Sequence, residues 1–238
     1  MPPAESDYPM KTQSFSIEHI PAVLYGEPAD RVWLFLHGQQ GSKAEGAAFA
    51  QVVCPKGFQV LAIDLPGHGA RSGHPEELVP WTAVPEIDAV AAWARARWPS
   101  LCLRANSIGA WLALLGEAVP DRALLVSPIL DMAELIQTMM GWAGVTEDAL
   151  RNCGEIPTDF GQTLSWRYLC YAREHPLRPW ACPTHILYGS RDTLTPRPTA
   201  EAFARRPHVH LTIREEGEHW FHTPAQLAVL TAWEAENS

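Results

Sequence analysis

One stretch, residues 101–115, constrains the fold of this 238-residue chain more than any other. It begins as an apolar-leaning run, breaks at Ser107 and resumes as an almost wholly apolar segment with the character of a helix. Small residues, Ala105 and Gly109, lie two positions to either side of the serine, as a sharp strand-to-helix turn with close packing requires. We therefore predict a strand, a tight turn that carries Ser107, and a helix.

The same order of strand, loop and helix recurs along the chain. A buried strand at 31–36 precedes the glycine loop 37–41, and the Ser-x-x-Glu spacing at 42–45 is that of a helix capping box. A strand at 59–63 precedes a loop with glycines and a proline, then a helix near 85–98 whose apolar residues follow helical spacing. Further strands are predicted at 12–17, 20–25, 123–126, 185–188 and 210–213, and a final helix begins near 223.

This alternation predicts an α/β fold, with a mostly parallel central β-sheet flanked by helices on both faces. Residues 129–183 depart from the rhythm, lack a clear strand and contain helical candidates at 132–142 and 163–174. We interpret them as a small helical lid inserted into one domain that spans residues 1–238. The hydrophobic content of 47% and the lack of a linker favour a single core.

Composition excludes several classes of function. A net charge of −9 argues against nucleic acid or an anionic membrane as a partner. No apolar run approaches the roughly 20 residues that span a bilayer, and residues 1–7 lack the basic-then-apolar pattern of an export signal. We therefore expect a cytoplasmic protein without a membrane partner. The sequence leaves the oligomeric state open.

Neither a metal nor another cofactor is expected. Five cysteines are odd in number, widely spaced and without a Cys-x-x-Cys pair, which argues against a disulfide framework and against a zinc site. His37 and His68 lie in glycine loops, but no acidic residues stand at ligand spacing around them. The loop 64–69 is interpreted as mainly structural.

An acid and a histidine follow two later predicted strands. Asp192 lies in the turn after the strand at 185–188, and His219 follows the strand that ends near 213. Because the carboxyl ends of parallel strands share one edge of a sheet, Ser107, Asp192 and His219 can meet there. A serine hydroxyl needs a base to remove its proton, and the base works best when a third group orients it. This pattern therefore predicts Ser107 as a nucleophile, Asp192 as an orienting acid and His219 as a general base.

From the glycine loop at 37–38 to the terminal helix, the chain resembles the α/β-hydrolase-fold serine hydrolases. Ala105-x-Ser107-x-Gly109 is similar to the family's nucleophile elbow, with alanine in place of the usual first glycine. The resemblance implies Asp192 as the triad acid and His219 as the base. It also implies an oxyanion hole made by the backbone N–H groups of Ile108 and Gln39, with Gln40 as the alternative to Gln39.

Each assignment has an alternative. Ser107 could be only a helix N-cap and Asp192 only a turn residue. His222 competes with His219, which is preferred because it directly follows a glycine loop.

The expected activity is hydrolysis of a small carboxylic ester through an acyl-enzyme intermediate. Aromatic residues of the lid and of the neighbouring loops suggest an apolar substrate site, to which we assign Gln40, Trp142, Trp166 and Trp220. The alternative for these aromatic residues is that they pack the lid on the body. Alternative functions are a thioesterase or an amidase or peptidase on the same fold, and a ligand-binding receptor of this fold that does not hydrolyse. A haloalkane dehalogenase is disfavoured because it requires an aspartate nucleophile.

Overall fold

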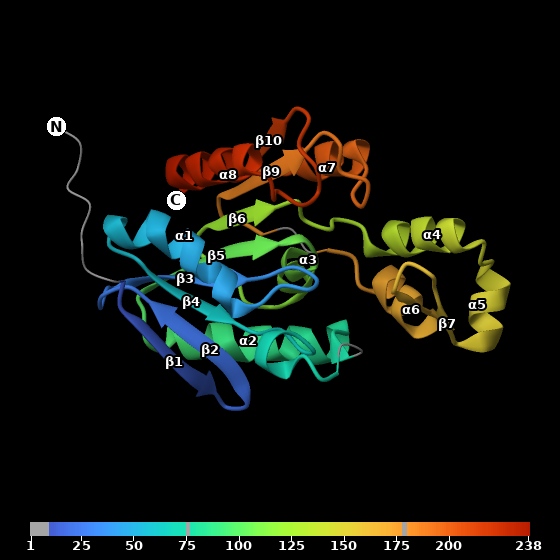
Figure 1. The fold of residues 1–238 in the computed structure, drawn as a ribbon, viewed down its shortest axis with the longest axis horizontal. Coiled ribbons are helices and arrows are strands. Elements are labelled where there is room, and N and C mark those ends of the chain that lie inside the picture. Colours follow the sequence, from blue (N-terminus) through green and yellow to red (C-terminus); the bar gives the residue numbers. More distant parts are fainter. Residues whose placement is uncertain (1–9, 75–76, 178–179) are drawn as a thin grey trace.

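A computed structural model describes residues 10–74, 77–177 and 180–238. Residues 1–7, on which the absence of an export signal was judged, lie outside the described residues. Within them, one sheet contains eight strands in the order β1-β2-β4-β3-β5-β6-β9-β10 (Figure 1). These strands are β1 Thr12–Ile17, β2 Ile20–Tyr25, β3 Arg31–Leu36, β4 Gln59–Ile63, β5 Ser100–Asn106, β6 Ala123–Val126, β9 Thr184–Gly189 and β10 Val209–Arg214.

The prediction of a mostly parallel sheet is confirmed. From β4 to β10 every neighbouring pair is parallel, whereas β1 pairs with β2 and β2 pairs with β4 in the antiparallel sense. The antiparallel hairpin at one edge is possible because only two residues, Glu18 and His19, join β1 to β2. The parallel strands of this sheet therefore end at the same edge; they are β4, β3, β5, β6, β9 and β10.

Helices cover both faces of the sheet, as predicted, and the alternation of β3 explains how (Figure 1). Trp33 and Phe35 point to one face, where they pack with Phe49 of α1 (Gly46–Val53) and with residues of α8 (Pro224–Asn237). Leu34 points to the opposite face, where the core contains residues of α2 (Pro80–Arg95) and α3 (Ser107–Leu115). The helix α7 (Arg197–Ala204) precedes β10. The central strands are thus apolar on both sides because both sides are covered.

The helix α2 begins five residues before its predicted start. Pro80 occupies its first position, where the missing N–H costs nothing, and Pro85 lies inside the helix rather than at its beginning. The sequence pattern misplaced this end because either proline can open a helix.

The predicted lid contains α4 (Met132–Ala143), α5 (Glu147–Cys153) and α6 (Trp166–Glu174). In Figure 1 these helices stand at one side of the body. Two short strands, β7 (Glu155–Pro157) and β8 (Thr163–Ser165), pair between them, although no strand was predicted there. The helix predicted at 163–174 is α6, which therefore starts at Trp166 rather than 163. The Ser165 hydroxyl accepts a hydrogen bond from the N–H of Tyr168 at the N-terminus of α6. In the described residues no helix is long and apolar enough to cross a membrane.

Candidate active site

Three side chains form a continuous chain of hydrogen bonds at the carboxyl edge of the parallel strands. Ser107 Oγ lies 2.8 Å from Nε2 of His219, and Nδ1 of His219 lies 2.7 Å from Oδ2 of Asp192. Ser107 comes directly after β5, Asp192 follows β9 and His219 follows β10. Asp192 and His219, which lie 85 and 112 residues after Ser107 in the sequence, thus come close to it because these strands run in one direction.

The backbone turns sharply at Ser107, which has a φ of +47°. This left-handed conformation is uncommon for a residue with a side chain and is typical of a strained strand-to-helix turn at a functional site. A Cβ atom on Gly109 would lie 2.4 Å from the carbonyl oxygen of His37, so the glycine is required by close packing. Ala105 is completely buried in the core, where its methyl group is accommodated.

Backbone hydrogen bonds hold Asp192 in place independently of its contact with His219. Its side chain is buried, and its Oδ1 accepts hydrogen bonds from the N–H groups of Leu194 (2.8 Å) and Thr195 (3.0 Å). The carboxylate Oδ2 is left to accept from Nδ1–H of His219, which makes Nε2 of that imidazole the acceptor for the Ser107 hydroxyl. The arrangement therefore suits proton transfer from the serine to the histidine.

The neighbouring histidine, His222, has other contacts. Its Nδ1 lies 2.7 Å from the carbonyl oxygen of Trp220, and its ring stacks on the Trp220 indole. The glycine Gly189, which the sequence analysis did not single out, helps to bring the loops together, since a Cβ there would lie 2.5 Å from the Gly217 carbonyl oxygen. The loop that carries His219 thus packs directly against the end of β9.

The loop after β3 passes beside the serine. A Cβ on Gly38 would lie 3.3 Å from Cβ of Ser107, and Gln40 has a left-handed backbone with φ of +63°. Ile108 lies in the first turn of α3, where backbone N–H groups have no partner within the helix. Among the described residues, the N–H groups of Gln39 and Ile108 donate no hydrogen bond. Neither N–H group is therefore committed to another partner within the described protein.

His37 ties this loop to the loop after β4. The imidazole is completely buried, its Nε2 accepts a hydrogen bond from the N–H of Leu65 (3.0 Å), and its Nδ1 lies 2.7 Å from the Gly38 carbonyl oxygen. Burial lowers the pKa of His37 to about 4, so the ring is neutral near pH 7 and its Nδ1–H donates to Gly38. His37 thereby helps to fix Gly38 and the following Gln39.

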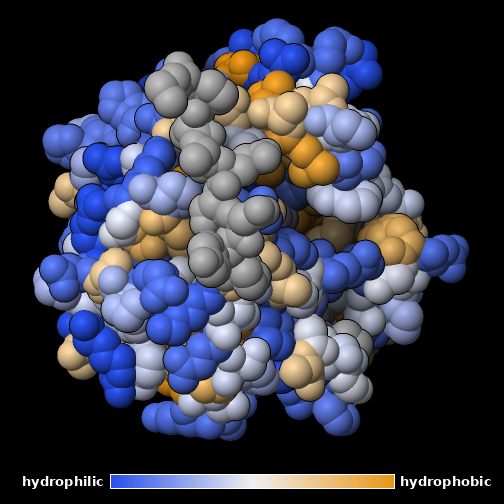
Figure 2. All heavy atoms as spheres, turned by 60° about the vertical axis from the view of Figure 1, so that its left-hand side comes forward, coloured by the Kyte–Doolittle hydropathy of each residue, from blue (hydrophilic) through white to orange (hydrophobic). Residues whose placement is uncertain are grey.

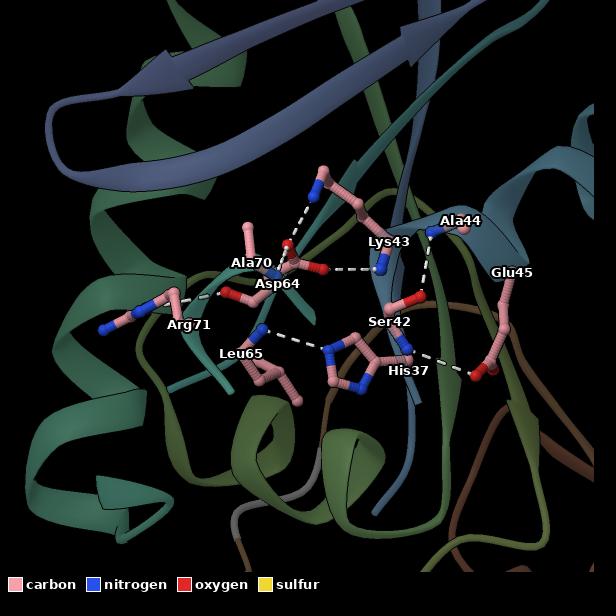
Figure 3. Close-up of polar contacts among 9 residues, drawn as sticks. All are labelled: His37, Ser42, Lys43, Ala44, Glu45, Asp64, Leu65, Ala70 and Arg71. Atoms are coloured by element: carbon pink, nitrogen blue, oxygen red, sulfur yellow. Dashed lines mark hydrogen bonds and ion pairs between the residues drawn. The ribbon is translucent and has the colours of Figure 1, made fainter. Parts of the chain in front are cut away.

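Asp64 makes a second connection between the same loops (Figure 3). Its buried carboxylate accepts hydrogen bonds from the N–H of Lys43 (2.8 Å), from the N–H of Ala70 (2.9 Å) and from the Lys43 ammonium group. Burial by itself would raise the pKa of Asp64, but the hydrogen bonds and the charge of Lys43 more than compensate and lower it. The loop 64–69, interpreted as structural, thus braces the loop beside Ser107.

A groove of about 680 Å³ opens beside Ser107 and His219 and is lined by residues of α1 and α8. Gln40 and Trp220, two of the four residues assigned to the substrate site from the sequence, line it. The structure does not bring Trp142 and Trp166 to this groove. Trp142 is exposed and packs edge-on against Phe160, and the ring of Trp166 lies under the Arg151 guanidinium.

Other aromatic residues of the lid pack on the body. Tyr168 contacts both Trp81 of α2 and Trp111 of α3, and Tyr171 contacts Trp81. These contacts favour the packing interpretation for the lid aromatics. In the part of the chain that the structure describes, no group of three or more His, Cys, Asp or Glu side chains could hold a metal ion.

The groove also contains two charged residues that the sequence analysis missed, Arg104 and Glu234. Arg104 is a cation within an otherwise mostly apolar strand, and that anomaly is a signal that could have identified it.

Comparison with known proteins places these features in a family. No curated protein matches the chain. Among solved structures, Est1E from Butyrivibrio proteoclasticus, described with ferulic acid bound, is 20% identical with a TM-score of 0.76 over 94% of this chain and 96% of its own. Alpha/beta hydrolase domain-containing protein 10 from mouse is 16% identical with a TM-score of 0.75 over 95% and 97%. The Pyrococcus furiosus esterase Pf2001 is 18% identical with a TM-score of 0.67 over 96% and 90%.

These similarities show a common fold. Residues 33–231, most of the chain, match the model of the alpha/beta hydrolase family. The sequence and the fold agree with that match, since the resemblance predicted from the elbow motif covers the same region. The chain therefore belongs to the alpha/beta hydrolase family and is a hydrolase.

Proposed function

We propose that this protein is a serine hydrolase that cleaves a carboxylic ester through an acyl-enzyme intermediate. The observation that carries the proposal is the hydrogen-bond chain from Ser107 Oγ through His219 to Asp192, with distances of 2.8 and 2.7 Å. Such a chain activates a hydroxyl that is otherwise a poor nucleophile at neutral pH.

In the first half of the reaction, Ser107 Oγ attacks the ester carbonyl carbon while Nε2 of His219 takes the hydroxyl proton. The carbonyl oxygen becomes an oxyanion, which the N–H groups of Gln39 and Ile108 stabilise. A well-placed donor of this kind contributes roughly 3 kcal/mol to lowering the barrier. The tetrahedral intermediate collapses as His219 returns its proton to the leaving alkoxide, and the alcohol departs.

In the second half, water replaces the alcohol. His219 takes a proton from the water, whose oxygen attacks the acyl carbon, and the Ser107 oxygen leaves and recovers the proton. Asp192 keeps its negative charge throughout, stabilises the imidazolium and holds the productive tautomer. Its two backbone hydrogen bonds from Leu194 and Thr195 keep it oriented.

An ester is proposed over a thioester or an amide because the neighbour Pf2001, with a TM-score of 0.67, is named an esterase, whereas the thioesterase domain from the curacin biosynthetic pathway is less similar, with a TM-score of 0.60. A thioesterase, an amidase and a peptidase use the same triad and remain the alternatives. A receptor without hydrolytic activity has no need of an aligned hydroxyl and base, so the geometry favours an enzyme.

The test compares wild type, Ser107→Ala and a control, Ser72→Ala, which removes the hydroxyl of an exposed serine. Purified proteins are assayed on p-nitrophenyl acetate, on an acetyl thioester and on an acetanilide. Ser107→Ala is expected to lose at least about 1,000-fold in kcat, because members of a triad act as a unit. Full activity of folded Ser107→Ala would overturn the proposal, and hydrolysis of the thioester or the anilide with no hydrolysis of the ester would replace it with the corresponding alternative.

A further inference from the structure

The groove beside the triad runs between α1 and α8, on the face of the sheet that these two helices cover. Figure 2 turns the end of the molecule that carries α1 and α8 toward the reader, where hydrophobic groups are scattered among hydrophilic ones. Much of the groove wall is apolar and comes from Phe35, Phe49, Val126, Phe221 and Leu230. Its volume of about 680 Å³ lies within the range of sites that enclose small organic ligands. The groove therefore has room for far more than an acetyl group.

An ion pair lies at the side of this groove, deep in the protein. Arg104 and Glu234 are only 2% and 4% exposed, and Nε and one terminal nitrogen of Arg104 lie 2.8 and 2.7 Å from Oε1 of Glu234. The guanidinium also donates to Oδ1 of Asn106 and lies 5.3 Å from the ring centre of Phe35. Such contacts offset part of the cost of burying the charge.

In the described part of the chain, two polar atoms of this cluster have no protein partner, and neither of them is fully buried. Among the described residues, neither Oε2 of Glu234 nor Nδ2 of Asn106 makes a hydrogen bond, although both residues line the groove. A free acceptor and a free donor thus belong to neighbouring members of one cluster within mostly apolar walls. A hydroxyl group can satisfy both, since it donates one hydrogen bond and accepts others.

The charges of the groove disfavour an anion. Glu45 and Glu234 contribute two carboxylates, against the single guanidinium of Arg104. A carboxylate at the end of a substrate would meet a net negative charge and would find only one cation, which is already paired. A neutral polar group meets no such repulsion.

We propose that the groove between α1 and α8 binds the acyl chain of the ester, and that Arg104, Glu234 and Asn106 select an acyl chain that ends in a hydroxyl group. The proposal rests on the proposed function, because it takes Ser107 as the nucleophile. Arg104 precedes Ser107 by three residues, two of them on β5 and the last at the strand-to-helix turn, so the two Cα atoms are at most about 10 Å apart. An acyl chain of about eight carbons is matched to that span.

The experiment uses three p-nitrophenyl esters of equal chain length and identical leaving group, the octanoate, the 8-hydroxyoctanoate and the suberate monoester, with the acetate as the minimal substrate. Wild type is expected to show a kcat/KM for the hydroxyoctanoate about tenfold or more above that for the octanoate, with the suberate lowest. Equal kcat/KM values for the three long esters would overturn the proposal.

Glu234→Gln tests the pair directly while keeping the size of the side chain. In this variant the ratio of kcat/KM for the hydroxyoctanoate over the octanoate should fall, and the ratio for the suberate over the octanoate should rise, because Arg104 loses its anionic partner. A merely structural role of the pair would leave both ratios unchanged. If this variant does not fold, Arg104→Met combined with Glu234→Leu replaces the pair by apolar groups, and the ratio of hydroxyoctanoate to octanoate should fall toward one.

A matched pair of tryptophan substitutions tests the location. Ala48 lies on α1 and lines the groove, whereas Ala143 is an exposed residue at the end of α4 in the lid. Ala48→Trp should lower the ratio of kcat/KM for octanoate over acetate about tenfold, and Ala143→Trp should leave it unchanged. An effect of Ala143→Trp without an effect of Ala48→Trp would place the acyl chain under the lid and overturn the proposal.

Failure of the groove assignment and failure of the proposed function give different results in these assays. Hydrolysis of acetate without discrimination among the long esters refutes the groove assignment alone. Absence of hydrolysis of every ester, with Ser107 unreactive toward an active-site probe, refutes the proposed function and the groove assignment with it.

Discussion

The buried imidazole of His37 makes the stability of this protein depend on pH in a specific window. His37 is fully buried, and burial lowers its pKa from 6.5 to about 4, although the hydrogen bond to Gly38 and the charge of Asp64 act in the opposite direction. The unfolded chain therefore binds a proton at a higher pH than the folded chain does. The contribution of the neutral His37 to the free energy of unfolding is therefore fully present above pH 6.5 and is lost as the pH falls toward 4.

The size of the effect follows from the two pKa values. With 6.5 for the unfolded chain and about 4 for the folded chain, the free energy of unfolding falls by about 2 kcal/mol between pH 7.5 and pH 5, and by about 3 kcal/mol at pH 4. Replacing His37 by glutamine removes this titration. The variant is expected to be less stable at pH 7.5, because the Leu65 N–H and the Gly38 carbonyl lose a well-placed partner.

Urea unfolding followed by tryptophan fluorescence at pH 7.5, 6.5, 5.5 and 5.0 measures the difference between wild type and His37→Gln. The deficit of the variant should shrink by about 2 kcal/mol over this range. His19→Gln, which removes a mostly exposed imidazole, is the control for the loss of a histidine as such. Parallel pH profiles for wild type and His37→Gln would refute the assignment of His37 as a buried neutral residue.

Three further predictions concern the triad and its support. Asp192→Asn should lower kcat about 10,000-fold, because an amide that can donate to His219 favours the wrong tautomer, and wild-type kcat in this variant would exclude an orienting role. Gly109→Ala places a Cβ 2.4 Å from the His37 carbonyl oxygen and should lower the free energy of unfolding by about 1–3 kcal/mol, whereas an unchanged urea midpoint would show that the elbow is loosely packed. Asp64→Asn should lose stability above about pH 5, with a deficit that shrinks as the pH falls below 3.8. The lowered pKa of Asp64 stabilises the fold fully while the carboxylate is charged in both states, and progressively less as the pH falls through the folded pKa. Urea unfolding at pH 7 and pH 3 checks the last point, and an equal deficit at both values would contradict it.

Much of the fold could be predicted because its local signals agree with one another. The apolar strands at 31–36, 59–63 and 123–126 are buried on both faces, and loops that contain glycine, proline or both separate them from the helices that follow. Parallel strands then bring residues that follow them to one edge, which is why Ser107, Asp192 and His219 could be grouped before any coordinates were known.

Other features depend on tertiary packing and had no comparable local signal. The strands β7 and β8 are three residues each and gain their hydrogen bonds only from one another, so the segment reads as helical or irregular in isolation. The groove arises where α8 packs beside α1, although these helices are about 170 residues apart in the sequence. The aromatic residues of the lid drew attention away from this groove, because aromatic side chains serve packing as readily as binding.

The role of Ser107 as nucleophile is the claim on which the proposed chemistry depends. The most direct measurement is labelling of the folded protein with a fluorophosphonate probe, followed by digestion and mass-spectrometric mapping of the modified peptide. One modified residue, Ser107, is expected, with labelling abolished in Ser107→Ala and greatly slowed in His219→Gln. Failure of the folded wild-type protein to react, or modification of a different serine, would contradict this role of Ser107.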